Sequence, residues 1–352
     1  MAARASRPAV MTDVAQLAGV SHQTVSRVVN GHPHVREETR ERVLAAMEKL
    51  GYRRNLTARA LATRRTDTIG VVAFDTTLYG PASTLFSIEE AARARDYHVS
   101  VVTVPDPDED AFADAVERLL EQSVTGVVVL APQRAQVRVM AGLPADLPAV
   151  AVEGGAAPGI PAVVIDQVDG AIQATRHLIE LGHRHVVHVS GREDWIEADA
   201  RLRGWRQAMS AAGLDLPPVL AGDWSPRSGY EAGLRLVAEQ PEATAVFAAN
   251  DHMALGMLRA LAEAGIDVPG QVSVVGFDDM AEAEFLRPPL TTVRQDFPEV
   301  GRRCVDLLLD RIAGGTTWFE GPPVVVPSRL VVRASTAARG GHGARPAGRS
   351  PG

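Results

Sequence analysis

The chain contains 352 residues, of which 46% are hydrophobic, and it carries a net charge of −7, so it exceeds one ordinary domain and can bury a large core. Its one cysteine, Cys304, excludes a disulfide framework within the chain, and no apolar run reaches the length of a membrane span. Cys304 lies in a helical run, and we expect it to fill the core. Because no charged-then-apolar leader stands at the N-terminus, we expect a soluble, cytoplasmic protein without a membrane partner.

Residues 12–30 predict two short helices joined by a tight turn at Gly19. Ser21 is the natural N-cap of the second helix. Five apolar residues recur at helical spacing and can close a small core: Val14, Leu17, Val25, Val28 and Val29. This arrangement is typical of a helix-turn-helix that reads DNA, although any short amphipathic helix pair can give the same pattern by chance.

The second of these helices begins with polar side chains, and that end of a recognition helix meets base edges in the major groove. Gln23 can form two hydrogen bonds with adenine, and Arg27 can contact guanine or a phosphate. We predict DNA contacts in this region from Thr12, Ser21, His22, Gln23, Thr24, Ser26, Arg27 and Asn30.

A third helix is predicted over residues 37–50, and a basic stretch of helical composition follows over residues 53–65. Residues 1–66 contain 12 Lys+Arg and 5 Asp+Glu, so the rest of the chain carries a charge of −14. A basic head on an acidic chain favours phosphate neutralisation over a merely solvated charged face. We therefore expect three N-terminal segments: a disordered start over 1–10, a helix-turn-helix domain over 11–54, and a hinge over 55–66 that folds only on DNA.

From Thr68 onward, short β-branched runs alternate with helical segments, which predicts parallel sheets flanked by helices. The runs are residues 69–74, 99–104, 126–130, 149–152, 163–166, 186–189, 245–249 and 272–277, with later strand-like returns at 291–294 and 324–326. These strands suffice for two doubly wound sheets in two lobes, and a cleft between such lobes is a natural ligand site. The expected boundaries are a core over 67–337, with an N-lobe of about 67–165 and 293–323 and a C-lobe of about 166–292 and 324–337, and a disordered tail over 338–352.

The other chemical signals in the sequence are weak. His183, His185 and His188 cluster without a fourth ligand nearby, so we predict no metal site. The sequence contains neither a phosphate-binding Gly-rich Lys motif nor a Ser nucleophile elbow. We therefore expect a protein that is not an enzyme and has no cofactor.

Seven motifs, in a specific order between residues 11 and 335, resemble those of the LacI/GalR family of transcription regulators. The motifs lie at 13–30, 39–52, 58–62, 222–225, 249–256, 272–279 and 288–297. The resemblance implies a helix-turn-helix head, a hinge helix, and an α/β core of the type I periplasmic-binding-protein fold whose two lobes close on an effector.

The resemblance also implies how the hinge acts on DNA. Leu61 matches a hinge leucine that wedges between central base pairs in the minor groove, Ala58 lies beside it, and Asn55 belongs to the same DNA-contacting segment. Because unstacking costs a few kcal/mol, two hinges must pair, which implies a homodimer on a palindromic operator. The tail contains no leucine heptad, so we expect the assembly to stop at a dimer.

For the effector, the resemblance implies a cleft that binds a sugar. The expected cleft residues are Glu153, Glu197, Arg201, Trp224, Asn250, Asp278, Gln295 and Phe297. Planar Arg, Asn and Asp groups can clamp vicinal hydroxyls, while an aromatic face covers a pyranose ring. From the residues alone, Asn250 and Asp278 could instead cap helices. One member of the family has Asp at the position of Glu153, Ser at Glu197 and Tyr at His22, so the pocket and the operator half-site are expected to differ.

The sequence therefore predicts a dimeric, nucleoid-associated repressor of carbohydrate-utilisation genes that a sugar, for example a galactoside, releases from its operator. One alternative is a regulator of the same family in which the ligand acts as a corepressor. Two alternatives from other classes are a sugar-binding protein without DNA regulation and a sugar or nucleoside enzyme. The basic head disfavours the first of these, and the missing nucleophile and phosphate loop disfavour the second.

Overall fold

A computed structural model describes residues 9–29, 34–52, 66–104, 109–153, 159–314, 319 and 321–339. The chain divides into two compact units, Met1–Thr66 and Asp67–Gly352. Four predicted DNA contacts, Asn30, Asn55, Ala58 and Leu61, lie outside the described residues, as do most of the segments expected as a disordered start, a hinge and a disordered tail.

The described part of the first unit contains three helices: α1 (Met11–Ala18), α2 (His22–Val29) and α3 (Glu37–Leu50). Gly19 ends α1 with a φ of 64°, a conformation that glycine adopts without strain. Ser21 caps α2 as predicted, because the Thr24 backbone N–H donates to its Oγ at 3.1 Å.

Val14, Val25 and Val43 form the centre of the core of this unit and are fully buried. The prediction that Leu17 belongs to this core is wrong, because the side chain is 43% exposed. The buried face of α1 consists of Val14, Ala15 and Ala18, and Leu17 points away from that face.

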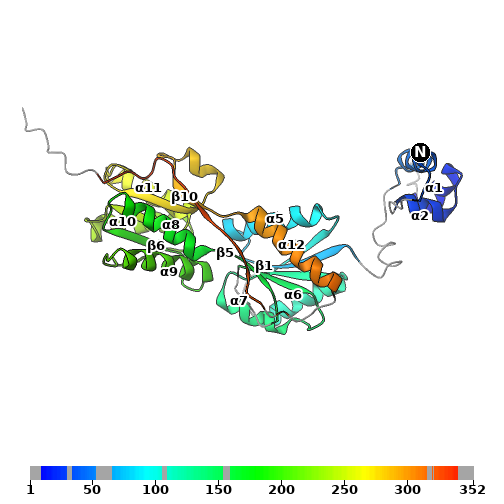
Figure 1. The fold of residues 1–352 in the computed structure, drawn as a ribbon, viewed down its shortest axis with the longest axis horizontal. Coiled ribbons are helices and arrows are strands. Elements are labelled where there is room, and N and C mark those ends of the chain that lie inside the picture. Colours follow the sequence, from blue (N-terminus) through cyan, green and yellow to red (C-terminus); the bar gives the residue numbers. More distant parts are fainter. Residues whose placement is uncertain are drawn as a thin grey trace, which may run out of the picture. The chain divides into compact units, whose positions relative to one another are not determined.

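The second unit contains two α/β lobes, each with a six-stranded sheet (Figure 1). The N-lobe contains β1 (Thr68–Phe74), α5 (Tyr79–Arg93), β2 (His98–Val104), α6 (Glu109–Glu121), β3 (Gly126–Leu130), α7 (Arg134–Val139), η1 (Met140–Gly142), β4 (Ala149–Val152), β5 (Ala162–Ile165), α12 (Phe297–Gly314) and β11 (Val324–Val326). The C-lobe contains α8 (Gln167–Glu180), β6 (Val186–Ser190), α9 (Ile196–Ala211), β7 (Leu220–Ala221), α10 (Pro226–Glu239), β8 (Ala245–Ala248), α11 (Asp251–Glu263), β9 (Ser273–Asp278), η2 (Ala281–Phe285), β10 (Thr291–Arg294) and β12 (Arg329–Val331).

The two sheets have equivalent strand orders, β11-β5-β4-β3-β1-β2 and β12-β10-β9-β8-β6-β7. Every pairing is parallel except that of β12 with β10. In the N-lobe, α5 and α12 cover one face of the sheet and α6 covers the other; in the C-lobe, α10 and α11 lie opposite α8 and α9. Cys304 lies on the buried face of α12 and is fully buried, as expected. The predicted fold class is confirmed: two doubly wound parallel sheets and a helical N-terminal unit.

The chain crosses between the lobes three times, after β5, β10 and β11. Two hydrogen bonds join the first and third crossings: the Asp166 N–H donates to the Val326 carbonyl at 2.9 Å, and Ser328 Oγ donates to the Asp166 carbonyl at 3.0 Å. The second and third crossings follow residues 294 and 326, slightly after the expected positions near 292 and 323, because β10 and β11 complete their pairing first.

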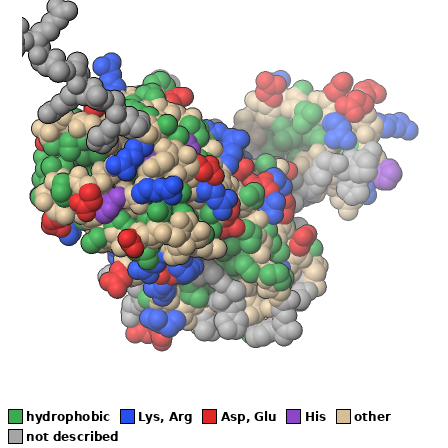
Figure 2. All heavy atoms as spheres, turned by 60° about the vertical axis from the view of Figure 1, so that its left-hand side comes forward, with side chains coloured by type: hydrophobic (Ala, Val, Ile, Leu, Met, Phe, Trp, Pro, Cys, Tyr) green, Lys and Arg blue, Asp and Glu red, His purple; other side chains and the backbone are tan. Residues whose placement is uncertain are grey.

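The surface helices of the C-lobe carry exposed ion pairs with i,i+4 spacing, such as Arg235–Glu239 on α10 and Arg259–Glu263 on α11. Figure 2 shows that side chains of both signs alternate over this face. Such exposed pairs contribute little stability. Among the described residues, no helix has the length and apolar composition that crossing a membrane requires.

Candidate functional site

Several polar and aromatic residues at the ends of strands adopt left-handed backbone conformations that favour glycine. Glu153 directly follows β4 with a φ of 67°, Trp224 follows β7 with a φ of 78°, and Asp278 ends β9 with a φ of 117°. Non-glycine residues pay roughly 1–3 kcal/mol for such conformations, which persist mainly at functional sites. Ligands of open α/β sheets bind at these carboxyl ends of the strands.

A cavity of about 410 Å³, including its part open to solvent, lies at these strand ends. Its lining comes from both lobes: Leu78, Tyr79, Gly80, Pro81, Glu153, Gln167, Trp195, Glu197, Arg201, Trp224, Asn250, Asp278 and Gln295. Trp195 and Trp224 meet edge to face, with ring centroids 5.5 Å apart. Gly191 provides the space for Trp224, because a Cβ at this position would lie 2.1 Å from the indole ring.

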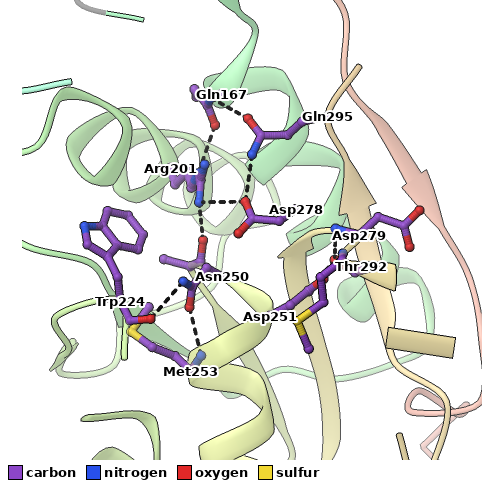
Figure 3. A network of polar contacts seen from close by, with 12 residues as sticks. Gln167, Arg201, Trp224, Asn250, Asp251, Met253, Asp278, Asp279, Thr292 and Gln295 are labelled. Atoms are coloured by element: carbon purple, nitrogen blue, oxygen red, sulfur yellow. Dashed lines mark hydrogen bonds and ion pairs between the residues drawn. The ribbon is translucent and has the colours of Figure 1, made fainter. Parts of the chain in front are cut away.

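Arg201 is the centre of a buried polar network (Figure 3). Its Nε donates to Gln167 Oε1 at 2.9 Å, and its guanidinium forms an ion pair with Asp278 at 3.7 Å. Gln295 closes the network, since its Nε2 donates to Asp278 Oδ1 at 2.7 Å and its Oε1 accepts from Gln167 Nε2 at 2.9 Å. The guanidinium also lies 3.9 Å from the ring centroid of Phe277. These contacts fix the orientation of the arginine before a ligand arrives.

Asn250 has a structural role and also faces the cavity. Its Oδ1 accepts from the Met253 N–H at 2.8 Å, so it caps α11, and its Nδ2 donates to the Trp224 carbonyl at 3.0 Å. The capping alternative for Asn250 is therefore correct, while Asp278 caps no helix and instead contacts Arg201 and Gln295.

The neighbouring Asp251 forms a separate buried connection between α11 and the sheet. It accepts from Thr292 Oγ1 at 2.6 Å and from the Met280 N–H at 2.9 Å (Figure 3). These two bonds tie β10 and the segment after β9 to α11, so they support the strand end that carries Asp278.

The predicted DNA-contacting residues of the first unit fall on one helix end and its flanks. Ser21, His22, Gln23 and Arg27 are exposed. Thr24 and Ser26 are partly buried, and Thr12 is exposed on α1. The opposite face of α2 is buried through Val25 and Val28, so the polar face remains available to a ligand.

Comparisons with known proteins give the same result for both units. A family model described as "Bacterial regulatory proteins, lacI family" matches residues 10–55, and one described as "Periplasmic binding protein-like domain" matches residues 175–336. The lactose operon repressor of Escherichia coli (strain K12) is 35% identical over 334 residues, which covers 94% of this chain and 92% of the repressor. The chain belongs to the LacI family. The HTH-type transcriptional regulator CelR of Thermobifida fusca is 38% identical over 338 residues, covering 92% of this chain and 96% of CelR.

Solved structures of LacI-family proteins show the same architecture. The lac repressor dimer bound to operator and the anti-inducer ONPF has a TM-score of 0.81 at 34% identity, covering 94% of this chain and all of that one. A CelR–cellobiose complex has a TM-score of 0.68 at 34% identity, covering 93% of this chain and 99% of that one. The expected type I periplasmic-binding-protein-like core is thus confirmed.

The cavity of this LacI-family protein contains seven of the eight residues predicted for effector binding. The eighth, Phe297, is not among the residues that line it, so its role as an aromatic wall stays a prediction. Phe297 begins α12 and is buried in the N-lobe core, where its ring centroid lies 6.0 Å from that of Tyr79. Tyr79 and Trp195 supply aromatic surface to the cavity that the sequence did not predict. Gln167 was also missed, although its position directly after a predicted strand could have revealed it.

Three buried carboxyl groups dominate the electrostatics of this cavity. Burial raises the pKa of Asp278 to about 7, against the opposing effect of Arg201. Burial also raises the pKa of Glu153, whose carboxylate accepts from Thr84 Oγ1 at 2.8 Å. Burial and then repulsion from Glu153 raise the pKa of Glu197 well above its ordinary range. These three carboxyl groups therefore keep their protons to higher pH than ordinary carboxyl groups do, and a bound ligand can change when they release them.

Between pH 4 and 7 the free energy of unfolding should fall because of Asp278, and we expect Asp278→Asn to remove this fall. Because the folded protein keeps a proton on Asp278 that the unfolded chain releases above an ordinary pKa of 3.8, the folded state loses stability as pH rises through this window. The loss is a few kcal/mol, at about 1.4 kcal/mol per pKa unit. The measurement is the difference in free energy of unfolding between wild type and variant from pH 4 to 8. A difference is needed because burial lowers the pKa of His188, so its contribution to stability rises with pH and opposes that of Asp278 in the wild-type curve.

Asp215→Asn is the matched control, because Asp215 is exposed. Its stability curve should follow that of the wild type. Parallel curves for wild type and Asp278→Asn would show that Asp278 titrates normally in the folded protein.

The prediction that the chain has no metal site was made mainly for the cluster of His183, His185 and His188. His183 is bonded to Thr244 and Ser273 at 3.0 Å each, and His188 stacks on Phe247 with ring centroids 4.8 Å apart. Within the described ranges, no group of three His, Cys, Asp or Glu residues could hold a metal ion.

Proposed function

We propose that this LacI-family protein is a homodimeric transcriptional repressor of carbohydrate-utilisation genes, which a saccharide releases from its operator. The observation that carries this proposal is the cavity in which the buried side chains of Arg201, Asp278 and Asn250 converge beside two indole rings. Planar polar groups with an aromatic surface recognise vicinal hydroxyls and the apolar face of a pyranose.

The relatives support a regulatory rather than a catalytic role. One solved relative is a lac repressor dimer on its operator, and another is a regulator in complex with cellobiose. Because these relatives are regulators, the proposal assigns no reaction to this chain. We place its action in the cytoplasm, on the DNA of the nucleoid.

The proposed DNA interface combines the polar face of α2 with the hinge predicted over residues 55–66. His22, Gln23 and Arg27 read base edges or phosphates, and Asn55, Ala58 and Leu61 act in the minor groove. Two copies are needed, because each recognition helix covers one half-site of a palindrome. A sugar that prefers the lobe arrangement incompatible with paired hinges then releases the DNA.

The proposal is tested by selecting fragmented genomic DNA on the full-length protein at physiological salt and sequencing the bound fragments. We expect an enriched palindrome, and we expect release of that fragment by at least one saccharide from a panel that includes lactose and cellobiose. Absence of an enriched sequence would reject the DNA-binding role. If adding the sugar tightens operator binding, the sugar is a corepressor rather than an inducer.

The glutamine pair at the lobe crossings provides a test of how the cavity is preorganised. Gln167 follows the first crossing and Gln295 follows β10, and each is bonded to the other and to one member of the Arg201–Asp278 pair. Replacing Gln167 by leucine leaves two buried polar groups with one partner fewer, which costs about 1–3 kcal/mol. We expect the saccharide that releases the operator to bind about tenfold more weakly.

Operator affinity without sugar should remain unchanged in this variant, as measured by titration of the selected fragment. Gln122→Leu is the control, since that side chain is exposed and accepts only from Ser100 at 2.6 Å. Equal sugar affinity in wild type and Gln167→Leu would remove Gln167 from the site.

A further inference from the structure

One wall of the cavity contains polar groups without a hydrogen-bond partner in the described structure. Both carboxylate oxygens of Glu197 and the indole Nε1 atoms of Trp195 and Trp224 are buried and have no hydrogen-bond partner in another residue. Glu197 is only 5% exposed, yet it lines the cavity. Unpaired buried polar groups are costly, and in a binding site they identify the complementary groups of the ligand.

The charges of the cavity lining do not balance. Glu153, Glu197 and Asp278 contribute three carboxyl groups, whereas Arg201 is the only cationic side chain in the lining. Arg201 is already engaged by Asp278, and its hydrogen bonds go to Gln167 and the Ala249 carbonyl. Glu153 is partnered by the neutral Thr84, and although the charge of Arg201 acts on both Glu153 and Glu197, its ion pair is with Asp278. Within the described cavity, the pair Glu153 and Glu197 therefore has no ion-pair partner of its own.

We propose that the Glu153–Glu197 pair selects an effector that carries a protonated amine, an amino sugar rather than a neutral one. This inference rests on the proposed function of the cavity as a saccharide site. An ammonium group supplies both the donors that Glu197 lacks and the positive charge that the pair lacks. The two unpaired indole N–H groups require acceptors, which the hydroxyl oxygens of the same sugar provide.

A neutral sugar satisfies this wall less well. Its hydroxyls can donate to Glu197, but the ligand would exclude water from two neighbouring carboxylates without supplying charge. One of them would then have to hold a proton, and the elevated pKa of Glu197 agrees with that cost. An ammonium removes this requirement, so affinity for the amine should exceed that for the matching alcohol.

The test is calorimetric titration of the full-length protein at pH 7 with matched ligands. The probes are cellobiose, the β-1,4-linked glucosamine dimer, the N-acetylglucosamine dimer, and the pairs glucose/glucosamine and galactose/galactosamine. We expect at least one amine to bind about tenfold or more tightly than its alcohol counterpart, and we expect N-acetylation to abolish the gain. In Glu197→Gln the amine and the alcohol should bind within about twofold of each other.

Glu193→Gln is the control, because Glu193 is exposed in the turn just before α9, the helix that carries Glu197, and does not line the cavity. It should retain the amine preference. Neutral sugars that bind and release the operator with no amine preference would overturn this inference and leave the proposed function intact. Failure of every sugar to bind would overturn both. The wild-type ligand series decides the question even if Glu197→Gln does not fold.

Discussion

Replacing Arg201 by alanine should make the protein a permanent repressor, which binds its operator normally but no longer responds to the saccharide. The guanidinium is 5% exposed and holds Asp278, Gln167 and the Ala249 carbonyl in place. Removing one partner of a buried, hydrogen-bonded charge pair costs about 3–5 kcal/mol, so sugar affinity should fall by at least about a hundredfold. The measurement is operator release against sugar concentration, together with calorimetric sugar binding.

Arg201→Lys should lose the response to the saccharide almost as completely. An ammonium cannot donate to Gln167 while it pairs with Asp278, because it lacks the fixed fork of the guanidinium. The matched control is Arg203→Ala, since Arg203 lies two residues along α9, is exposed, and pairs only with Asp199 at the surface. A normal sugar response in Arg201→Ala would place the effector site elsewhere.

The fold was largely predictable because the central strands of both sheets are buried on both faces. Parallel strands between helices appear in the sequence as continuous apolar runs, such as Val127–Leu130 of β3. β7 and β12 were not predicted, because they have only 2 and 3 residues and lack the consecutive β-branched residues that revealed the equally short β11. Leu17 was misplaced for a related reason, since a helix of 8 residues contains too few turns for its spacing to define one buried face.

The cavity was predictable only in part. Asn250 and Asp278 directly follow the strands predicted over 245–249 and 272–277, and the topology of a parallel sheet brings ligands to such ends, so position and residue type agreed. Trp195 and Tyr79 follow no such rule, because Trp195 stands at the N-cap of α9 and Tyr79 begins α5, away from any predicted strand end. Phe297 has the aromatic character of a sugar platform, but it begins a helix that packs on the N-lobe sheet, and packing determined its position.

Replacing Gln23 by alanine should lower operator affinity about tenfold to a hundredfold and relax base preference at one position of each half-site. Gln23 is the second residue of α2 and is exposed, while Val25 and Val28 hold the helix from its other face. A glutamine with two hydrogen bonds to adenine contributes about 1–3 kcal/mol of discrimination, and a dimer places it at both half-sites. The measurement is the binding of a library in which each operator position is varied.

The readout that decides this prediction is the base preference rather than the affinity alone. Gln16→Ala is the matched control, because Gln16 is an exposed glutamine of the same unit that lies on α1. If either glutamine contacts only a phosphate, its removal would weaken all sequences equally, whereas removal of a base contact changes one position of the profile. An unchanged profile in Gln23→Ala would assign sequence reading to other residues of α2, of which His22 is the first to test. Sugar binding should be unaffected by every substitution in the first unit, because the cavity belongs to the second unit.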